Sequence, residues 1–196
     1  MKYAFLLLLL AEIMMLSALT FEAEELNFYL ENDLWEIDGL FHFANYDSLS
    51  THKLIFFPVP SDSLCLPPKI KALSVQDDKE GVVTMLNQAK NGFTFLLSLP
   101  ALSFCSLHLD YTQTLKSNYA KYIITTTNSW GRPLPYAKYT LHPGINVQIR
   151  SLPFPVQKQE GRNYIWNFTI LLPKRNLRLH SKPFLQKIRT NYIETH

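Results

Sequence analysis

Three residues of one predicted strand carry the kinds of side chain that nucleophilic catalysis uses. Ser106, His108 and Asp110 occupy alternate positions, with apolar residues between them. Side chains at alternate positions of a strand lie about 6.5–7 Å apart along it, whereas a serine nucleophile and its histidine base must approach within about 2.6–3.2 Å. The spacing therefore predicts a polar strand face and not a catalytic triad. The chain also has no Gly-x-Ser-x-Gly sequence, which many hydrolases use to expose a nucleophilic serine.

The two cysteines, Cys65 and Cys105, are the other candidates for special chemistry. Cys105 shares an apolar strand face with Leu107 and Leu109, where a reactive thiolate would be disfavoured. In an oxidising compartment a disulfide between the cysteines would close a loop of about 40 residues, worth roughly 3–4 kcal/mol in the chain-entropy model. The alternative is two buried thiols that pack as small apolar side chains. We predict the disulfide.

The pattern of ionisable residues argues against several classes of function. The six histidines show no ligand spacing such as His-x-x-x-His, so we predict no bound metal. The alternative is a metal site that combines Glu36, Asp38 and His42 with a loop. Six glycines form no phosphate-binding loop, and we predict no cofactor. Residues 24–173 hold 12 basic and 13 acidic residues, so the body lacks the basic stripe that nucleic-acid binding needs.

The segment Trp130-Gly131-Arg132 is the strongest candidate for a recognition loop. Trp and Arg are enriched in binding hot spots, and we take Trp130, Arg132 and Tyr136 as candidate binding residues. A carbohydrate or a lipid would then bind in a groove lined by the exposed rings of Trp130, Tyr136 and Tyr139. In the alternative interpretation, Trp130 folds back and caps the domain.

The N-terminus has the parts of an export segment. Lys2 precedes an apolar run with five consecutive leucines, and small residues follow the run. We expect cleavage after Thr20 or after Ala23. The alternative is an uncleaved membrane tether through residues 3–21, because 19 residues come close to the ~20 needed to cross a bilayer. The charges on either side place the body outside the cytoplasm in both cases, so that it is periplasmic, extracellular or membrane-anchored.

The rest of the chain is predicted to be all-β. Short alternating runs rich in Val, Ile, Phe, Tyr and Thr are split by Pro, Gly, Asn and Asp, and no amphipathic helix of three turns is visible. Such a pattern favours an antiparallel β-sandwich of Greek-key or immunoglobulin-like type. The predicted strands cover residues 34–46, 53–57, 70–75, 82–87, 93–99, 104–114, 119–127, 135–141, 145–152 and 164–172.

We divide the chain into three segments. Residues 1–23 are the signal peptide or membrane anchor, residues 24–173 the β-sandwich domain, and residues 174–196 a basic C-terminal tail. If the body consists of two consecutive small β units, Pro100 marks the boundary. The tail carries six basic residues and one acidic residue, and we expect either a solvated extension or a contact with anionic surfaces.

Several short motifs resemble those of uncharacterised secreted bacterial β-sandwich proteins. They are Phe43-Ala44-Asn45, Phe57-Pro58-Val59-Pro60, Tyr111-Thr112-Gln113, the run 122–127 and Trp130-Gly131-Arg132-Pro133. The resemblance spans most of residues 34–172. It implies a β-sandwich in a bacterial envelope setting, and it implies no activity.

These observations lead to three hypotheses about function. The first is a non-enzymatic, exported structural or protein-interaction module with an envelope protein or a glycan as partner. The second is a carbohydrate- or lipid-binding module that uses the aromatic residues near Trp130. The third is a hydrolase whose catalytic groups come from scattered strands. We expect no nucleic-acid partner under any of the three.

Overall fold

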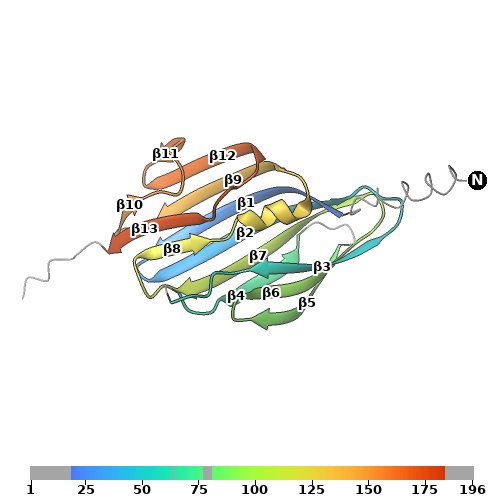
Figure 1. The fold of residues 1–196 in the computed structure, drawn as a ribbon, viewed down its shortest axis with the longest axis horizontal. Helices are drawn as coiled ribbons and strands as arrows, with labels where there is room; N and C mark the ends of the chain where they lie inside the picture. The colour runs from blue at the N-terminus through green and yellow to red at the C-terminus, as the bar shows by residue number, and fades with distance from the viewer. Residues whose placement is uncertain (1–18, 64, 77–80, 184–196) are drawn as a thin grey trace, which may run out of the picture.

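The computed structural model describes residues 19–63, 65–76 and 81–183, and almost all regular structure in them is β (Figure 1). Within these residues no helix is long and apolar enough to cross a membrane. The predicted export segment up to residue 18 and the tail from residue 184 lie outside them. The elements are β1 (Leu19–Glu31), β2 (Leu34–Asn45), β3 (Thr51–Pro58), β4 (Lys69–Val75), β5 (Val82–Ala89), β6 (Gly92–Leu99), β7 (Ser103–Thr114), β8 (Tyr119–Tyr122), the 3₁₀ helix η1 (Thr125–Trp130), β9 (Leu134–Pro143), β10 (Val147–Ser151), β11 (Lys158–Glu160), β12 (Asn163–Leu171) and β13 (Leu177–Pro183).

A seven-stranded sheet forms the frame of the molecule, in the order β11-β12-β9-β1-β2-β7-β4. β1 and β2 form a hairpin whose two-residue turn is Asn32-Asp33. Asn32 has φ 50°, a left-handed conformation that asparagine tolerates better than most residues. β1 is central and pairs in parallel with β9, while the other ladders of this sheet are antiparallel. Strands from both ends of the described chain therefore share one sheet, and Pro100 does not divide it into two units.

The inward face of β1 depends on a β-bulge near its start. The register with β2 shifts between Phe21 and Ala23, and the extra residue reverses which positions face inward. Phe21 is buried before the bulge, whereas Glu24, Leu26 and the even-numbered positions that follow are buried after it. The bulge thus brings a carboxyl group to the core side of the sheet.

Two three-stranded sheets cover the inward face of the large sheet, in the orders β10-β13-β8 and β3-β6-β5. Figure 1 shows β8, β13 and η1 crossing in front of β1 and β2, with β3, β5 and β6 beside them. The aromatic ring of Tyr122 on β8 meets Phe28 on β1 at 5.3 Å, edge to face. On the side of the other small sheet, Phe93 of β6 meets Tyr111 of β7 at 5.6 Å.

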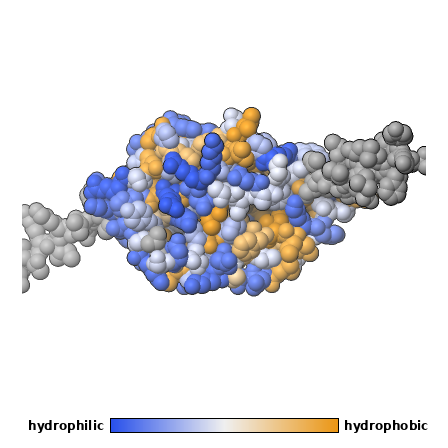
Figure 2. Space-filling model, in the orientation of Figure 1, coloured by the Kyte–Doolittle hydropathy of each residue, from blue (hydrophilic) through white to orange (hydrophobic). Residues whose placement is uncertain are grey.

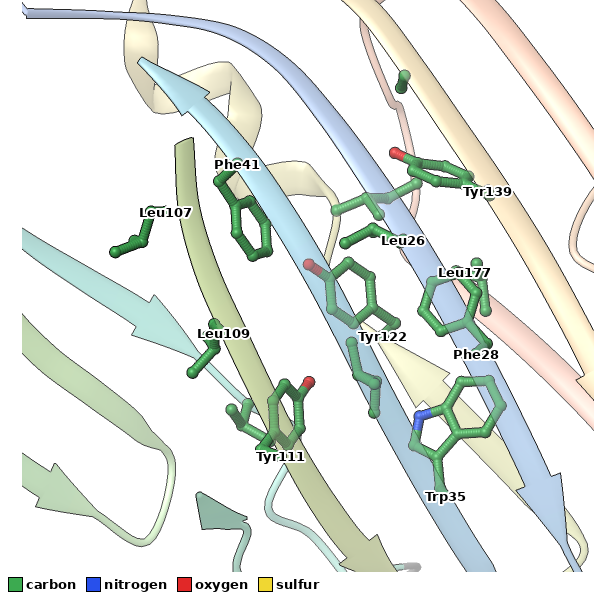
Figure 3. Packing of buried hydrophobic residues seen from close by; sticks show 14 of the residues in the cluster. Leu26, Phe28, Trp35, Phe41, Leu107, Leu109, Tyr111, Tyr122, Tyr139 and Leu177 are labelled. Atoms are coloured by element: carbon green, nitrogen blue, oxygen red, sulfur yellow. The ribbon is translucent and has the colours of Figure 1, made fainter. Parts of the chain in front are cut away.

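The core between these layers is dominated by aromatic side chains (Figure 3). Phe28 and Trp35, which are diagonal neighbours across the β1–β2 hairpin, stack with ring centroids 5.2 Å apart. Gly39 makes room for Phe41, because a Cβ atom at Gly39 would lie 2.7 Å from the Phe41 ring. Burial of an aromatic side chain removes about 150–250 Å² from water, so this cluster is the main source of stability.

The predicted all-β, sandwich-like fold is confirmed, with three local differences. β1 was not predicted, because residues 19–23 were assigned to the export segment and residues 24–31 were assigned to no strand. Residues 125–130, partly assigned to a strand, form η1 instead. Leu177–Pro183, placed in the solvated tail, is β13, which pairs with β10 and β8. The alternation of Leu177 and Leu179 with polar residues is the pattern that identifies it as a strand.

The predicted disulfide between Cys65 and Cys105 is not formed. Cys65 forms an isolated bridge with Leu115, beyond the end of β7, whereas Cys105 lies ten residues earlier, near the start of that strand. Ten residues of strand span about 33 Å, and a disulfide requires Cα atoms within about 7 Å. Both cysteines are buried, as in the alternative that we considered, and the Cys65 thiol lies 3.1 Å from the Pro60 carbonyl oxygen.

Truncation of Phe28 should strongly destabilise the fold. Phe28→Ala removes a fully buried ring that contacts β2, β8 and β9, and we expect the free energy of unfolding to fall by about 3–5 kcal/mol. Phe104→Ala is the matched control, since this ring is 60% exposed, and it should cost less than ~1 kcal/mol. Urea unfolding followed by far-UV circular dichroism measures both. Equal decreases in the free energy of unfolding of the two variants would contradict this assignment of the core.

Candidate functional site

A cavity of about 380 Å³ lies between the large sheet, strand β3 and the segment from β8 to η1. We call it the Trp130 cavity. Most of its lining residues are apolar, and aromatic rings supply much of the wall. The lining residues are Phe21, Glu24, Phe41, Phe43, Lys53, Leu54, Ile55, Phe56, Phe57, Pro58, Phe95, Leu107, Tyr122, Ile123, Thr126, Thr127, Ser129 and Trp130.

Three aromatic rings form one end of the Trp130 cavity. Phe21 and Phe43 stack with centroids 5.1 Å apart, and the Trp130 ring lies 5.7 Å from Phe21 and 5.5 Å from Phe43. Trp130 is the last residue of η1, and Gly131 ends the helix with φ 75°, a left-handed conformation typical of helix C-termini. The ammonium of Lys53 lies 4.3 Å from the centroid of the Trp130 ring, within cation–π range.

Glu24 supplies the carboxyl group of the Trp130 cavity. Its side chain is 2% exposed, and the Tyr139 hydroxyl donates a hydrogen bond to one of its oxygens. Burial raises the pKa of Glu24 to about 7, against the opposing effect of the hydrogen bond from Tyr139. The acid is therefore largely protonated below neutral pH and can ionise close to it.

The three predicted binding residues do not converge on one groove. Trp130 is partly buried and lines the cavity. Arg132 forms an ion pair with Glu22 at the start of β1. Tyr136 lies on the outer side of β9, where its hydroxyl is 3.5 Å from Asn167 Oδ1.

The ring of Tyr139, which the proposed groove would also need, is buried in the core and contacts Phe28 and Phe168. Trp130, Tyr136 and Tyr139 therefore do not form a surface platform of exposed rings. We take the Trp130 cavity as the candidate site instead.

Sequence reasoning missed Glu24, Lys53 and the aromatic residues beside them. The residues around Glu24 looked like the acidic flank of an export segment, and the bulge that turns this side chain inward leaves no clear sequence signal. The alternation of Leu26 and Phe28 with polar residues is the signal that could have identified a strand there.

The outer face of the large sheet carries the polar row that contains Ser106, His108 and Asp110. As predicted from their spacing, these three residues do not contact one another in a triad. Ser106 Oγ instead lies 3.0 Å from Nδ1 of His42, its cross-strand neighbour on β2. His108 Nε2 lies 2.7 Å from Asp38 Oδ1, also across the β2–β7 ladder.

The Ser106–His42 pair lacks the remaining parts of a hydrolase site. The His42 ring is 4.0 Å from the Glu25 carboxylate, too far for the hydrogen bond that orients a catalytic histidine. β7 pairs on both sides, with β2 and β4, so its ladders engage the backbone N–H groups that an oxyanion hole would use. The row therefore remains a polar sheet face. Among the described residues, no group of three or more His, Cys, Asp and Glu side chains is placed to hold a metal ion.

Basic residues of the predicted tail line a hollow beside the start of β13. Lys174, Arg175 and Arg178 surround it together with Thr125 and residues 151–153. The guanidinium and ammonium groups at this end would favour an anionic surface. The tail residues Lys187 and Arg189 lie outside the described part of the chain.

Comparison with known proteins finds likeness in structure alone. No protein-family model matches the sequence, and no curated protein matches it. A candidate nutrient-binding protein from Legionella pneumophila has a similar structure, with a TM-score of 0.63 and 15% identity over 85% of this chain and 67% of that protein. The shared fold is what this likeness shows.

Two zinc metallopeptidases of the M1 class have weaker likeness. One is a two-domain enzyme bound to L-tryptophan, with a TM-score of 0.49 and 12% identity over 84% of this chain and 43% of the enzyme. The other is from Deinococcus radiodurans, with a TM-score of 0.46 and 11% identity over 83% of this chain and 42% of the enzyme. The present chain spans less than half the length of each enzyme.

The buried acid should make the stability of the protein depend on pH. The pKa of Glu24 is about 7 in the folded protein and 4.5 is its ordinary value, so the unfolded chain loses this proton first as the pH rises. The stability contributed by the protonated acid is present below pH 4.5 and is lost as the pH rises to about 7. Glu24→Gln should remove this loss, which amounts to roughly 3 kcal/mol by pH 8.

Urea unfolding of the wild type and of Glu24→Gln between pH 4 and pH 8 tests this expectation. Glu25→Gln is the matched control, because the neighbouring carboxylate lies on the outer side of β1, partly exposed and near Lys138. The control should follow the wild-type pH dependence. If Glu24→Gln also followed it, the acid would not titrate as proposed.

Proposed function

We propose that this chain is an exported, non-enzymatic binding module that holds a small, largely apolar ligand in the Trp130 cavity. One observation carries the proposal: a cavity of about 380 Å³ whose walls are mostly aromatic and aliphatic, with few polar groups. Ligand sites in proteins commonly have volumes of about 300–1,000 Å³ and this kind of lining. Binding would gain about 25 cal/mol for each Å² of apolar surface removed from water.

The candidate nutrient-binding protein from Legionella pneumophila is in keeping with this proposal, since its name describes binding of a nutrient and its fold is similar. The export part of the proposal comes from the sequence of residues 1–23, with its lysine, leucine run and acidic flank. An envelope or extracellular location suits a module that captures a ligand and performs no reaction on it.

The cavity favours an apolar or lipid-like ligand over a carbohydrate. Sugars bind to exposed aromatic platforms bordered by many hydrogen-bonding groups, whereas the polar side chains of this cavity are few. Those polar side chains are Glu24, Lys53, Thr126, Thr127 and Ser129. Thr127 already donates a hydrogen bond to the backbone oxygen of Ile124, and Ser129 to that of Thr126.

A neutral fluorescent probe tests the proposed cavity. N-phenyl-1-naphthylamine brightens in apolar sites, and we expect it to bind the wild-type protein with saturation at one site. Thr126→Trp should reduce the affinity at least tenfold, because the larger side chain fills the space that Thr126 borders. Thr112→Trp is the matched control, since Thr112 lies on the outer face of β7.

The control variant should bind the probe as the wild type does. A wild type without saturable binding, or equal binding by both variants, would contradict the proposal. Thermal unfolding of both variants verifies that each is folded.

A second candidate function, protein interaction, is favoured by an exposed apolar surface. Alternate residues of β3, β6 and β5 face away from the core, and we call this surface the outer β3–β6–β5 face: Leu54, Phe56, Val82 and Leu96. Leu54 is 60% exposed and Phe56 is 50% exposed. Figure 2 shows the hydrophobic patch over this part of the molecule. β3 is an edge strand, so a second chain has both apolar side chains and backbone groups to bind.

Self-association through the outer β3–β6–β5 face is the simplest test of this second function. We expect the body, residues 19–196, to form a dimer in sedimentation velocity, and Phe56→Lys to make it monomeric by placing a charge in the contact. Phe104→Lys is the matched control, because Phe104 is as exposed but lies on β7 in the large sheet. A monomeric wild type, or dissociation by both variants, would argue against this surface.

A further inference from the structure

The polar groups of the Trp130 cavity indicate the chemical class of its ligand, an inference that rests on the proposed function. Glu24 lines the cavity from the core side of β1, where its side chain is almost wholly buried. Lys53 lies at the open side, on edge strand β3 and over the partly exposed Trp130 ring. A ligand that fills the cavity therefore has one end near a carboxyl group and its sides against aromatic rings.

The surroundings of Glu24 contain hydrogen-bond donors and aromatic rings. The Tyr139 hydroxyl on β9 donates to one carboxyl oxygen. Tyr122 on β8 lies close enough for the charge of Glu24 to raise the pKa of its phenol further, although burial is the main cause. Lys53 on β3 is the cationic side chain that lines the same cavity, and burial lowers its pKa. The pKa of Glu24 itself responds to burial and to the Tyr139 hydrogen bond, and neither of these is a cation.

We infer that the ligand carries an ammonium group, which binds to Glu24, on an apolar body that fills the aromatic part of the cavity. A buried carboxylate is costly without a cation, so an incoming ammonium is its most favourable partner. The faces of Phe and Tyr rings also attract cations, which strengthens the same preference. Phe41, which pairs with Glu24 across the hairpin, and Tyr122 line the same cavity as the carboxyl group.

Binding of this ligand replaces the proton on Glu24 with the ammonium group of the ligand. Below neutral pH the free protein holds a proton on Glu24, and the ligand arrives as an ammonium ion that keeps its own protons. The carboxyl proton leaves to solvent as the ion pair forms. Ligand affinity should therefore rise with pH up to about 8, by about tenfold between pH 6 and pH 8, because the ionised fraction of Glu24 rises by that factor.

Three ligands that share a phenyl ring on a short alkyl chain test the inference: 2-phenylethylamine, its isostere 2-phenylethanol and the slightly larger 3-phenylpropanoate. Isothermal titration calorimetry of the wild type should show the amine binding at least tenfold more tightly than the alcohol at pH 8. At pH 6, titrations in two buffers of different ionisation enthalpy should show release of close to one proton for each amine bound. Glu24→Gln should abolish the preference for the amine and the proton release.

Glu25→Gln is the matched control, and it should keep the preference, the pH dependence and the proton release of the wild type. Binding of N-phenyl-1-naphthylamine should persist in Glu24→Gln, which verifies that the variant keeps an intact cavity. Equal affinity for the amine and the alcohol, or tighter binding of the propanoate, would overturn the ammonium assignment and leave the apolar cavity standing. Loss of saturable probe binding in the wild type would instead overturn the proposed function.

Discussion

The β-bulge near the start of β1 is the constraint on which the rest of the site depends. Phe21 precedes it and Glu24 follows it, and both face the core because one extra residue lies between them. In a regular strand, Ala23 and Glu25 would take the inward positions. The bulge therefore combines an aromatic wall with a buried acid on one central strand. β2 and β9, which pair with β1 on its two sides, then supply Phe41 and Tyr139 to the same place.

Burial of Glu24 is unfavourable for folding, and the surrounding core must compensate for it. A carboxyl group moved from water into an apolar site without a partner costs several kcal/mol, and the Tyr139 hydrogen bond recovers part of that. Leucine or phenylalanine at position 24 would fit the pattern of the neighbouring strand positions without this cost. An unfavourable acid in an otherwise apolar cavity is the kind of local inconsistency that functional sites show. This reasoning makes Glu24, and not the more exposed polar row on β7, the centre of the candidate site.

The sequence was sufficient to predict the fold class, because alternation along β2, β6 and β7 directly reflects burial of one sheet face. The sequence was insufficient to predict side-chain contacts between residues of different strands. Ser106 pairs with His42 through the register of two strands that are far apart in the chain, and no local pattern gives that register. The disulfide prediction was wrong for the same reason, since Cys65 forms its β-bridge with Leu115, next to the far end of the strand that carries Cys105. The bulge in β1 also leaves no local pattern, and the acid that it buries was therefore missed.

Strand β3 contributes residues to both proposed functions. Lys53, Ile55 and Phe57 lean toward the core, whereas Leu54 and Phe56 are more exposed, and all five residues border the Trp130 cavity. Because successive side chains of a strand point to opposite faces, a change at Ile55 or Phe57 acts on the cavity, whereas a change at Leu54 or Phe56 acts on both the outer face and the rim of the cavity. As an edge strand, β3 forms backbone hydrogen bonds with a neighbouring strand on one side only. Side-chain contacts on its two faces therefore contribute a large share of its stability. A ligand in the cavity and a partner on the outer face would thus both stabilise β3, and binding of one would favour binding of the other.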